Sequence, residues 1–560
     1  MNERTGGAVL IDALKANGVD LAFCVPGESY LEALDAFYDA RDAIRLIVCR
    51  QEGGAAYMAE AFGKLTGRPG ICFVTRGPGA TNASIGIHTA RQDSTPMILF
   101  VGQVETTMKG REAFQEVEIA ATFGTLAKWA SDIDDASRIP EYVARAFHVA
   151  TSGRPGPVVL GLPEDVLAAR VRVGDVAAAS PARSVPPTDA LERMRALVAQ
   201  SARPLAILGG SGWTVAARRE IAAWLEAASI PTACGFRRQD LIDNESPVYV
   251  GHAGVGIMPY LAKRIVEADL VLAIGSRLGE AVTQGFTLIE APRPKQRLIH
   301  VYPDPDELGR VYQPDLPINA AIPEFAAALR SLAPPEPRWR AWSSALREEY
   351  EGSRDVARRE ARAREGYVDL ANVVAHLAQT LPNDAIVTTG AGNFAGWVHR
   401  YFRYRNYPAQ LGAVNGSMGY GLPSALAAKL VHPKRLVVAF CGDGDFLMTG
   451  QELATAMQYH VPVVVVLANN GMYGTIRMHQ EREHPERVVG TELTNPDFVR
   501  LAEAYGAHAE RVATDDEFPA AFERARASGR LAVLELAVDP ELLSTRATVG
   551  SLRERAKTRS

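Results

Sequence analysis

The chain has 560 residues, of which 47% are hydrophobic and 22% charged, and its formal net charge is −5. This length predicts about three domains of roughly 150–200 residues each, and the composition is that of a globular protein with several cores. Charges of both signs are interspersed along the chain, which argues against a nucleic acid or an anionic membrane surface as partner.

No apolar run approaches the roughly 20 residues that span a bilayer, and the polar N-terminus is not typical of a signal peptide. The five cysteines are scattered, and none belongs to a C-x-x-C pair. We therefore expect reduced core thiols in a cytoplasmic protein.

Strand-like and helix-like segments alternate throughout, which predicts an α/β fold with three doubly wound parallel-sheet domains. The expected domains are residues 1–170, 188–335 and 366–545, separated by linkers rich in Ala, Ser and Pro. A charged stretch over 340–364 is expected to be helical, and the polar tail, 551–560, is expected to be mobile. The expected strands are Ile44–Val48, Gly70–Val74, Met97–Val101, Pro157–Gly161, Leu205–Leu208, Leu270–Ile274, Leu298–Val301, Ala385–Thr388, Leu436–Cys441, Val461–Leu467 and Leu531–Leu536.

Two strands of the predicted third domain end in polar residues. One runs into Gly442-Asp443-Gly444-Asp445, and a helical segment, Gln451–His460, follows; the other ends at Asn469-Asn470, with 24 residues between Gly444 and Asn469. That gap fits one crossover helix and one strand, which returns the chain beside its start. Ligands bind beyond the carboxyl ends of parallel strands, which is where these polar residues lie. Their carboxylate and amide oxygens suit Mg²⁺. A helix after the Gly-Asp-Gly turn would present its N-terminal amides to a phosphate.

A lone Gly-Asp-Gly is usually a turn, but the paired pattern resembles the diphosphate-binding signature of thiamine diphosphate enzymes. The resemblance implies that Asp443, Asn470 and the backbone carbonyl of Met472 bind Mg²⁺. The cofactor-binding residues it implies in this domain are Gly442, Asp443, Gly444, Asp445, Asn470, Met472, Tyr473, Gly474 and, in "TTGAGNFAGW" (388–397), Asn393.

The same family needs a glutamate after an N-terminal strand, which bonds N1′ of the cofactor's pyrimidine. The stretch "LIVCRQEGGAAYMAEAFGKLTG" (46–67) supplies Glu52, although a carboxylate at a helix N-terminus is also a plain stabilising feature, worth about 0.3–1 kcal/mol. In "NGSMGYGLPSALAAKL" (415–430), the resemblance implies that Met418 holds the cofactor bent, and that the Gly416 carbonyl and Met418 amide bond the pyrimidine edge.

Further N-terminal motifs match the family pattern. "TRGPGATN" (75–82) implies cofactor contacts from Pro78 and Asn82, and the loop around Gly27 is counted with them. By the same resemblance, "FQEVE" (114–118) implies that Phe114 contacts the substrate and that Gln115 is both a substrate-contacting and a catalytic residue.

The resemblance covers about residues 4–540, and its closest pattern is the acetolactate synthase-like group. In this family the two halves of the site come from different subunits, which implies a homodimer or homotetramer, and C₂ pairing is the commonest symmetry.

Three positions depart from the acetolactate synthase pattern. Glu28 stands where those synthases carry glycine and resembles an acidic residue of thiamine-dependent decarboxylases; it could be a general acid or an N-cap. In Arg277-Leu-Gly-Glu-Ala281 the second arginine is replaced by alanine, which leaves FAD open but doubtful. His479 replaces a tryptophan near the substrate, and its neighbour Arg477 is either an anion contact or a solvated charge.

The expected function is therefore a thiamine diphosphate- and Mg²⁺-dependent enzyme of 2-keto acids that decarboxylates and then joins carbon units. The alternatives are a 2-keto acid decarboxylase, or a lyase or decarboxylase of 2-hydroxyacyl or oxalyl thioesters. A catalytically silent binding subunit is a further alternative, disfavoured because Glu52, Met418, Asp443 and Asn470 occur together.

Overall fold

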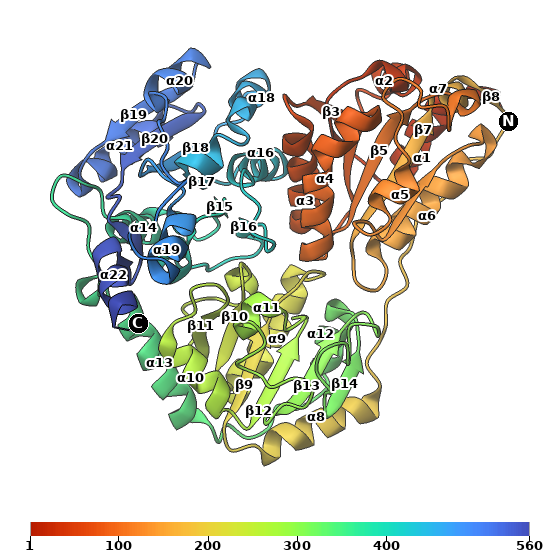
Figure 1. Cartoon of the computed structure of the whole chain (residues 1–560). Coiled ribbons are helices and arrows are strands. Elements are labelled where there is room, and N and C mark those ends of the chain that lie inside the picture. Colours follow the sequence, from red (N-terminus) through yellow and green to blue (C-terminus); the bar gives the residue numbers. More distant parts are fainter. Residues whose placement is uncertain (1, 559–560) are drawn as a thin grey trace. The chain divides into compact units, whose positions relative to one another are not determined.

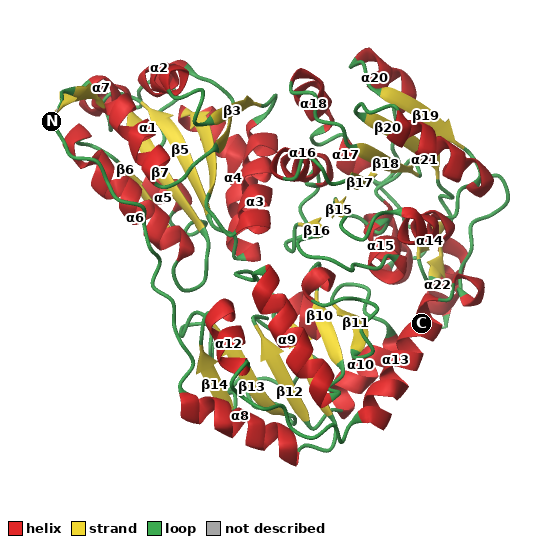
Figure 2. Cartoon of the chain, turned by 180° about the vertical axis from the view of Figure 1, so that it is seen from behind, coloured by secondary structure: helices red, strands yellow, loops and turns green. Residues whose placement is uncertain are grey.

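The computed structural model describes residues 2–558 and contains three six-stranded parallel sheets, each flanked by helices (Figures 1 and 2). The predicted α/β fold with three parallel-sheet domains is thus confirmed. The chain divides into two compact units: unit 1 comprises Met1–Ala182, Ala413–Pro433 and Thr449–Val461, and unit 2 comprises Arg183–Gly412, Lys434–Met448 and Pro462–Ser560. Two segments of the predicted third domain therefore lie in unit 1.

The sheet of unit 1 has the strand order β3-β2-β4-β5-β7-β6, with all neighbours parallel. Its inner strands are apolar on both faces, as parallel strands covered by helices require. The strands are β2 (Leu21–Cys24), β3 (Arg45–Val48), β4 (Gly70–Thr75), β5 (Met97–Gln103), β6 (Trp129–Asp132) and β7 (Pro157–Pro163), with a small pair β1 (Arg4–Thr5) and β8 (Arg170–Val171).

Helices α1, α2 and α6 bury their apolar sides against this sheet. Two further helix pairs pack together in unit 1: α3 with α4, and α16 with α3 (Figure 1). The helices of unit 1 are α1 (Gly6–Ala16), α2 (Leu31–Asp39), α3 (Glu52–Thr66), α4 (Arg76–Asp93), α5 (Ile119–Phe123), α6 (Ile139–Thr151), α7 (Glu164–Ala168), α16 (Gly421–Val431) and α18 (Leu453–Gln458).

The first sheet of unit 2 has the order β11-β10-β9-β12-β13-β14, so the strand order reverses between β9 and β12. Its strands are β9 (Pro204–Leu208), β10 (Thr232–Gly235), β11 (Tyr249–Ala253), β12 (Leu270–Ile274), β13 (Arg297–Tyr302) and β14 (Leu316–Asn319). Its helices are α8 (Thr188–Gln200), α9 (Val215–Ala228), α10 (Pro259–Glu267), α11 (Glu280–Thr283), α12 (Ile322–Leu329) and α13 (Arg340–Arg354).

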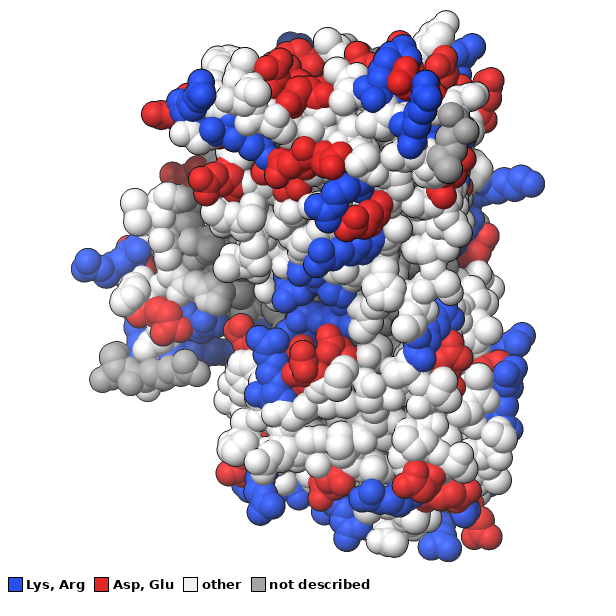
Figure 3. Space-filling view, turned by 90° about the vertical axis from the view of Figure 1, so that its right-hand side faces the viewer, with Lys and Arg blue, Asp and Glu red and all other residues white. Residues whose placement is uncertain are grey.

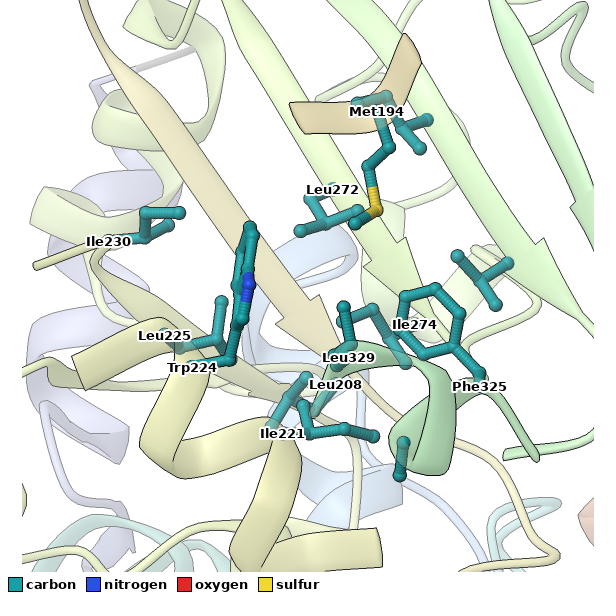
Figure 4. Packing of buried hydrophobic residues seen from close by; sticks show 14 of the residues in the cluster. Met194, Leu208, Ile221, Trp224, Leu225, Ile230, Leu272, Ile274, Phe325 and Leu329 are labelled. Atoms are coloured by element: carbon teal, nitrogen blue, oxygen red, sulfur yellow. The ribbon is translucent and has the colours of Figure 1, made fainter. Parts of the chain in front are cut away.

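The core of this domain is close-packed between β9, β12 and helices α8, α9 and α12 (Figure 4). Ile221, Trp224 and Leu225 of α9 belong to the same buried cluster as Leu208 of β9, and Phe325 of α12 is fully buried in it. Burial of a side chain such as Phe325 stabilises the fold by about 1.5–3 kcal/mol. The periodic apolar positions of α9 and α12 therefore account for the packing of these two helices on the sheet.

The second sheet of unit 2 has the order β16-β15-β17-β18-β20-β19 and is parallel throughout. Strands β17 and β18 are neighbours, which confirms that the chain returns beside the Gly-Asp-Gly turn. The strands are β15 (Ile386–Thr389), β16 (Gln410–Gly412), β17 (Val437–Gly442), β18 (Val464–Asn469), β19 (His508–Val512) and β20 (Ala532–Ala537). The helices are α14 (Leu370–Thr380), α15 (Ala395–Tyr401), α17 (Asp443–Phe446), α19 (Gly474–Glu483), α20 (Phe498–Ala504), α21 (Phe518–Ala527) and α22 (Val549–Lys557).

Three local expectations need correction. The charged helix ends at Arg354 rather than at residue 364, because the positions beyond it bury no continuous apolar stripe. The helix after the Gly-Asp-Gly turn is a single turn, Asp443–Phe446. The tail expected to be mobile forms α22 up to Lys557, with Val549 and Leu552 buried; residues 559–560 lie outside the described part.

The structure shows two features that the sequence predicts: charges of both signs on the surface, and cysteines in the core. The face drawn in Figure 3 carries both acidic and basic side chains, several of them next to one another among uncharged residues. All five cysteines are free and buried. Within residues 2–558, no helix is both long enough and apolar enough to cross a membrane.

Candidate active site

Glu52 is the first residue of α3, directly beyond the carboxyl end of β3. The helix starts here because Gln51 caps it: its side chain accepts a hydrogen bond from the Gly54 amide at 3.0 Å. The Glu52 carboxylate accepts a hydrogen bond at 2.9 Å from the side-chain amide of Asn82 on α4. Two predicted site residues are thus brought together on neighbouring helices.

The backbone before Glu52 is held by a residue that sequence reasoning missed, Glu452. Its carboxylate is fully buried and accepts hydrogen bonds from the amides of Arg50 (3.1 Å) and Gln51 (3.0 Å). Burial raises the pKa of Glu452, while hydrogen bonds from Thr455 and these two amides oppose the rise. A carboxylate that binds backbone amides so far away in sequence carries no motif, so the sequence offered no signal for it.

Glu28 lies beyond the carboxyl end of β2 and begins a short 3-10 turn, Glu28–Tyr30, that packs on the end of β4. The N-cap of this turn is Gly27 and that of α2 is Tyr30, so the alternative of Glu28 as an N-cap is wrong. A Cβ atom at Gly27 would lie 2.3 Å from the Cβ of Thr75, so only glycine fits there. The hydroxyls of Ser29 and Thr75 are 2.7 Å apart, which fixes the loop. The Glu28 carboxylate is largely exposed within the chain and lies 4.0 Å from the Arg76 guanidinium.

The backbone beside Glu28 is strained. Arg76 has φ +36° and Gln115 has φ +63°, conformations that cost non-glycine residues about 1–3 kcal/mol and cluster at functional sites. They are held because the Gly77 amide donates to the Gln115 carbonyl at 2.8 Å, and Arg76 donates to the Phe114 carbonyl at 3.1 Å. Pro78 follows in the first turn of α4, and the Phe114 side chain is 73% exposed.

The loop that carries Gly416 and Met418 is anchored in unit 1. The Met418 carbonyl accepts a hydrogen bond from the Tyr57 hydroxyl of α3 at 3.0 Å, and the hydroxyls of Ser417 and Thr89 are 3.0 Å apart. Gly416 has φ +72°, the left-handed region that glycine adopts at little cost. The loop is therefore fixed to α3 and α4.

The Asp443 carboxylate is buried at the end of β17, where it meets the end of β18. Its Oδ1 accepts from the Gly444 amide (2.9 Å), and its Oδ2 accepts from the Gly471 amide and the Asn495 side chain (2.8 Å each). Burial raises the pKa of Asp443, and these hydrogen bonds oppose the rise. Asn495 was not predicted, since its Asn-Pro sequence indicates only a turn.

The loop 470–473 follows β18 and is pinned by residues 491–493. The Tyr473 amide donates to the Thr491 carbonyl at 2.8 Å, and the Leu493 amide donates to the Gly471 carbonyl at 2.8 Å. The Asn470 side-chain oxygen accepts from the Met472 amide at 3.3 Å. Asn470, Met472, Tyr473 and Gly474, where α19 begins, therefore lie in one fixed loop beside Asp443.

Glycines allow this loop to close on the strand ends. A Cβ at Gly444 would lie 2.5 Å from the Tyr473 ring, and one at Gly442 would lie 2.6 Å from the Phe394 ring. The Asp445 carboxylate accepts from the Ala391 amide at 2.9 Å. The turn therefore packs tightly against two aromatic rings, and its two carboxylates accept hydrogen bonds from neighbouring backbone amides.

Other predicted residues have structural partners of their own. The Asn393 side chain donates to the Leu543 carbonyl at 2.7 Å. On α19, Arg477 donates to Glu481 at 2.8 Å, and His479 lies near Arg482, with Nδ1 2.7 Å from its Nη2. In the other domain of unit 2, Arg277 pairs with Glu307 at 2.9 Å, and Ala281 lies in α11.

These residues fit a magnesium diphosphate. A buried carboxylate, a side-chain amide and a backbone carbonyl are hard oxygen donors of the kind that Mg²⁺ binds alongside phosphate oxygens. Gly442 and Gly444 let the rings of Phe394 and Tyr473 pack closely against this turn, which fixes it beside the carboxylate. Asp443, Asn470 and the Met472 carbonyl remain the predicted ligand set.

Comparison with known proteins agrees with this fold. Three models of thiamine pyrophosphate enzymes match the chain: the N-terminal TPP binding domain at residues 4–122, the central domain at 191–329 and the C-terminal TPP binding domain at 390–536. The chain therefore belongs to the thiamine pyrophosphate (thiamine diphosphate) enzymes.

Its relatives include acetolactate synthase large subunits. The chain is 32% identical over 552 residues to a probable acetolactate synthase large subunit of Methanocaldococcus jannaschii, covering 96% of this chain and 92% of that protein. It is 30% identical to the large subunit of acetolactate synthase isozyme 2 of Escherichia coli, covering 95% of each. The chain is an acetolactate synthase-like member of the family.

Proposed function

We propose that the chain is a thiamine diphosphate- and Mg²⁺-dependent enzyme that decarboxylates a 2-keto acid and joins the remaining carbon unit to a carbonyl acceptor. The observation that carries this proposal is the buried Asp443 carboxylate, 2.8 Å from the Gly471 amide of the loop that holds Asn470 and Met472. The likeness to acetolactate synthase large subunits supports the carboligation step.

Thiamine diphosphate, when bound, supplies the electron sink that carbon–carbon cleavage and formation require. Asp443, Asn470 and the Met472 carbonyl would hold Mg²⁺, and the amides around Gly442–Asp445 would receive the diphosphate. Glu52 would hold a proton at N1′ of the pyrimidine, with Asn82 orienting its carboxylate through the 2.9 Å hydrogen bond. Met418 would keep the cofactor bent.

The proposal includes an assembly of at least two copies. Glu52 of one copy and Asp443 of another would complete one site, as the thiamine pyrophosphate enzymes typically form dimers with sites at the interface. A homodimer or a homotetramer satisfies this requirement.

A second candidate, a 2-keto acid decarboxylase without ligation, is favoured by one observation. Glu28 places a carboxylate 4.0 Å from Arg76, beside the strained Gln115 loop. A carboxylic acid there could protonate the product carbon, since general acids contribute when they are held near the reacting group. Release of an aldehyde would then replace ligation.

A substrate panel separates the two candidates. The protein is incubated with 2-keto acids, thiamine diphosphate and Mg²⁺, and products are followed by mass spectrometry. Ligated 2-hydroxy-2-keto acids support the first candidate, and free aldehydes with CO₂ support the second. Absence of CO₂ release from every 2-keto acid tested would contradict both.

A further inference from the structure

The C-terminal segment, defined as residues 542–557, contacts predicted site residues on two different loops of unit 2. The Leu543 carbonyl accepts the hydrogen bond from Asn393. Met472 and Met478 pack against a buried apolar cluster of this segment. The members of the cluster are Leu543, Ala547, Val549 and Leu552.

An ion cluster joins the same segment to α19. The carboxylate of Glu481 is fully buried and accepts two parallel hydrogen bonds from Arg553 of α22, at 2.8 and 2.7 Å. Arg477, one turn earlier on α19, donates to the same carboxylate at 2.8 Å, and the Glu486 amide donates at 3.1 Å. These bonds, led by those from Arg553, lower the pKa of Glu481 to about 2.

The two arginines have different effects. A buried carboxylate is costly unless it is paired and hydrogen-bonded. Arg477 lies on the same helix as Glu481, so their pairing leaves the helix free to move as a unit. Arg553 comes from α22, and its two parallel bonds fix both distance and angle between the helices. Arg553 therefore ties α19 to α22 at Glu481.

The position of α19 matters because the helix begins at Gly474, directly after Met472 and Tyr473. Glu481 lies about 10 Å along the helix from Gly474, at 1.5 Å per residue. A helix held at that end and packed through Met478 cannot tilt without moving the Met472 carbonyl. The geometry thus connects the clamp to the predicted metal loop.

We propose that Arg553 and Glu481 are positioning residues of the thiamine diphosphate site: they hold α19, and with it Met472 and Arg477, against the C-terminal segment. This inference rests on the proposed function. Loss of the clamp should weaken cofactor binding rather than remove a group that touches the cofactor.

The test compares Arg553→Met with Arg555→Met, the same change at an exposed position of the same helix. Thiamine diphosphate is titrated by calorimetry at saturating Mg²⁺, at a temperature where both variants are folded. We expect about tenfold weaker binding or more for Arg553→Met, since loss of groups that orient a metal site typically costs that much, and parent-like binding for Arg555→Met. Arg553→Lys should fall between them, because a lysine cannot donate two parallel bonds.

Hydrogen exchange of the peptide 470–480 gives a second readout, which Arg553→Met should accelerate and Arg555→Met should not. A lower melting temperature with unchanged cofactor affinity and exchange would make the clamp merely structural and overturn the inference. If Arg553→Met does not fold, Arg553→Lys and Glu481→Gln decide by the same measurements. A parent that binds no thiamine diphosphate would overturn the proposed function as well, whereas a parent that binds it while Arg553→Met binds equally would overturn this inference alone.

Discussion

Glu52 acts, in our account, through the charge of its carboxylate. The carboxylate is oriented by Asn82 at 2.9 Å, and the preceding backbone is held by Glu452. A carboxylate at a helix start also stabilises the helix, here α3, by about 0.3–1 kcal/mol. A purely structural role for Glu52 therefore predicts a small effect of its substitution on turnover, and a catalytic role predicts a large one.

Glu52→Gln should lower turnover at least tens-fold, in the range that general acid–base groups contribute. The amide keeps the size and can still meet Asn82, but it cannot hold a proton at N1′ as a carboxylate does. Steady-state kinetics on the best substrate of the panel measure the loss. Glu290→Gln, an exposed change of the same kind, serves as control, and a Glu52→Gln enzyme within twofold of the parent would rule out the assignment.

At the scale of elements, long apolar strands could be predicted, whereas short or polar strands were missed. Leu270–Ile274 matches β12 because a parallel strand covered on both faces is a continuous apolar run. Strands β6 and β19 were missed because each lies at a sheet edge, and their residues are mostly half-buried and polar. The apolar pattern therefore finds long buried runs, but it misses short buried strands such as β2 and polar strands such as β6.

Some residues of the candidate site could be predicted from the sequence, and others could not. Glu52 and Asp443 could be predicted because each follows a strand in a recognisable motif. Asn495, Glu452 and Arg553 could not, since each reaches its partner from a distant part of the chain as an isolated polar residue. The tail was misjudged because its few apolar residues, Val549 and Leu552 among them, suffice to dock a short helix.

Docking of α22 should depend on pH through Glu481. Its folded pKa of about 2 lies below the ordinary value of 4.5, so the pairing contributes stability above pH 4.5 and loses it as pH falls through about 2. Arg553→Met removes the largest cause of that shift. The difference in melting temperature between parent and Arg553→Met should therefore narrow from pH 6 toward pH 3 in scanning calorimetry. A difference that stays constant over this range would contradict the argument.

For the whole molecule, we expect a colourless protein that is active without added FAD. Arg277 is already paired with Glu307, and Ala281 offers no charge to a flavin or to a keto acid carboxylate. Decarboxylation and ligation need no redox step. An absorption spectrum of freshly purified protein decides, and a flavin band near stoichiometric amounts would show this expectation to be wrong.

Pairing of copies can be tested by complementation. Glu52→Gln and Asp443→Ala chains are co-expressed with different affinity tags, and the mixed assembly is purified through both tags. If Glu52 and Asp443 of different copies complete one site, a mixed dimer has one intact site and recovers about half of the parent's activity per dimer. If both residues of a site came from one chain, every site would carry a defect and no activity would return.

In our proposal, the turn around Asp443 binds the diphosphate of thiamine diphosphate through Mg²⁺. Calorimetric titration of the parent and of Asp443→Ala with thiamine diphosphate, with Mg²⁺ and then with a chelator, tests it directly; Asp516→Ala, an exposed change, is the control. We predict Mg²⁺-dependent binding by the parent and by Asp516→Ala, and much weaker binding by Asp443→Ala, which lacks a hard anionic ligand. Equal binding by Asp443→Ala and the parent, or binding that survives the chelator unchanged, would contradict the account.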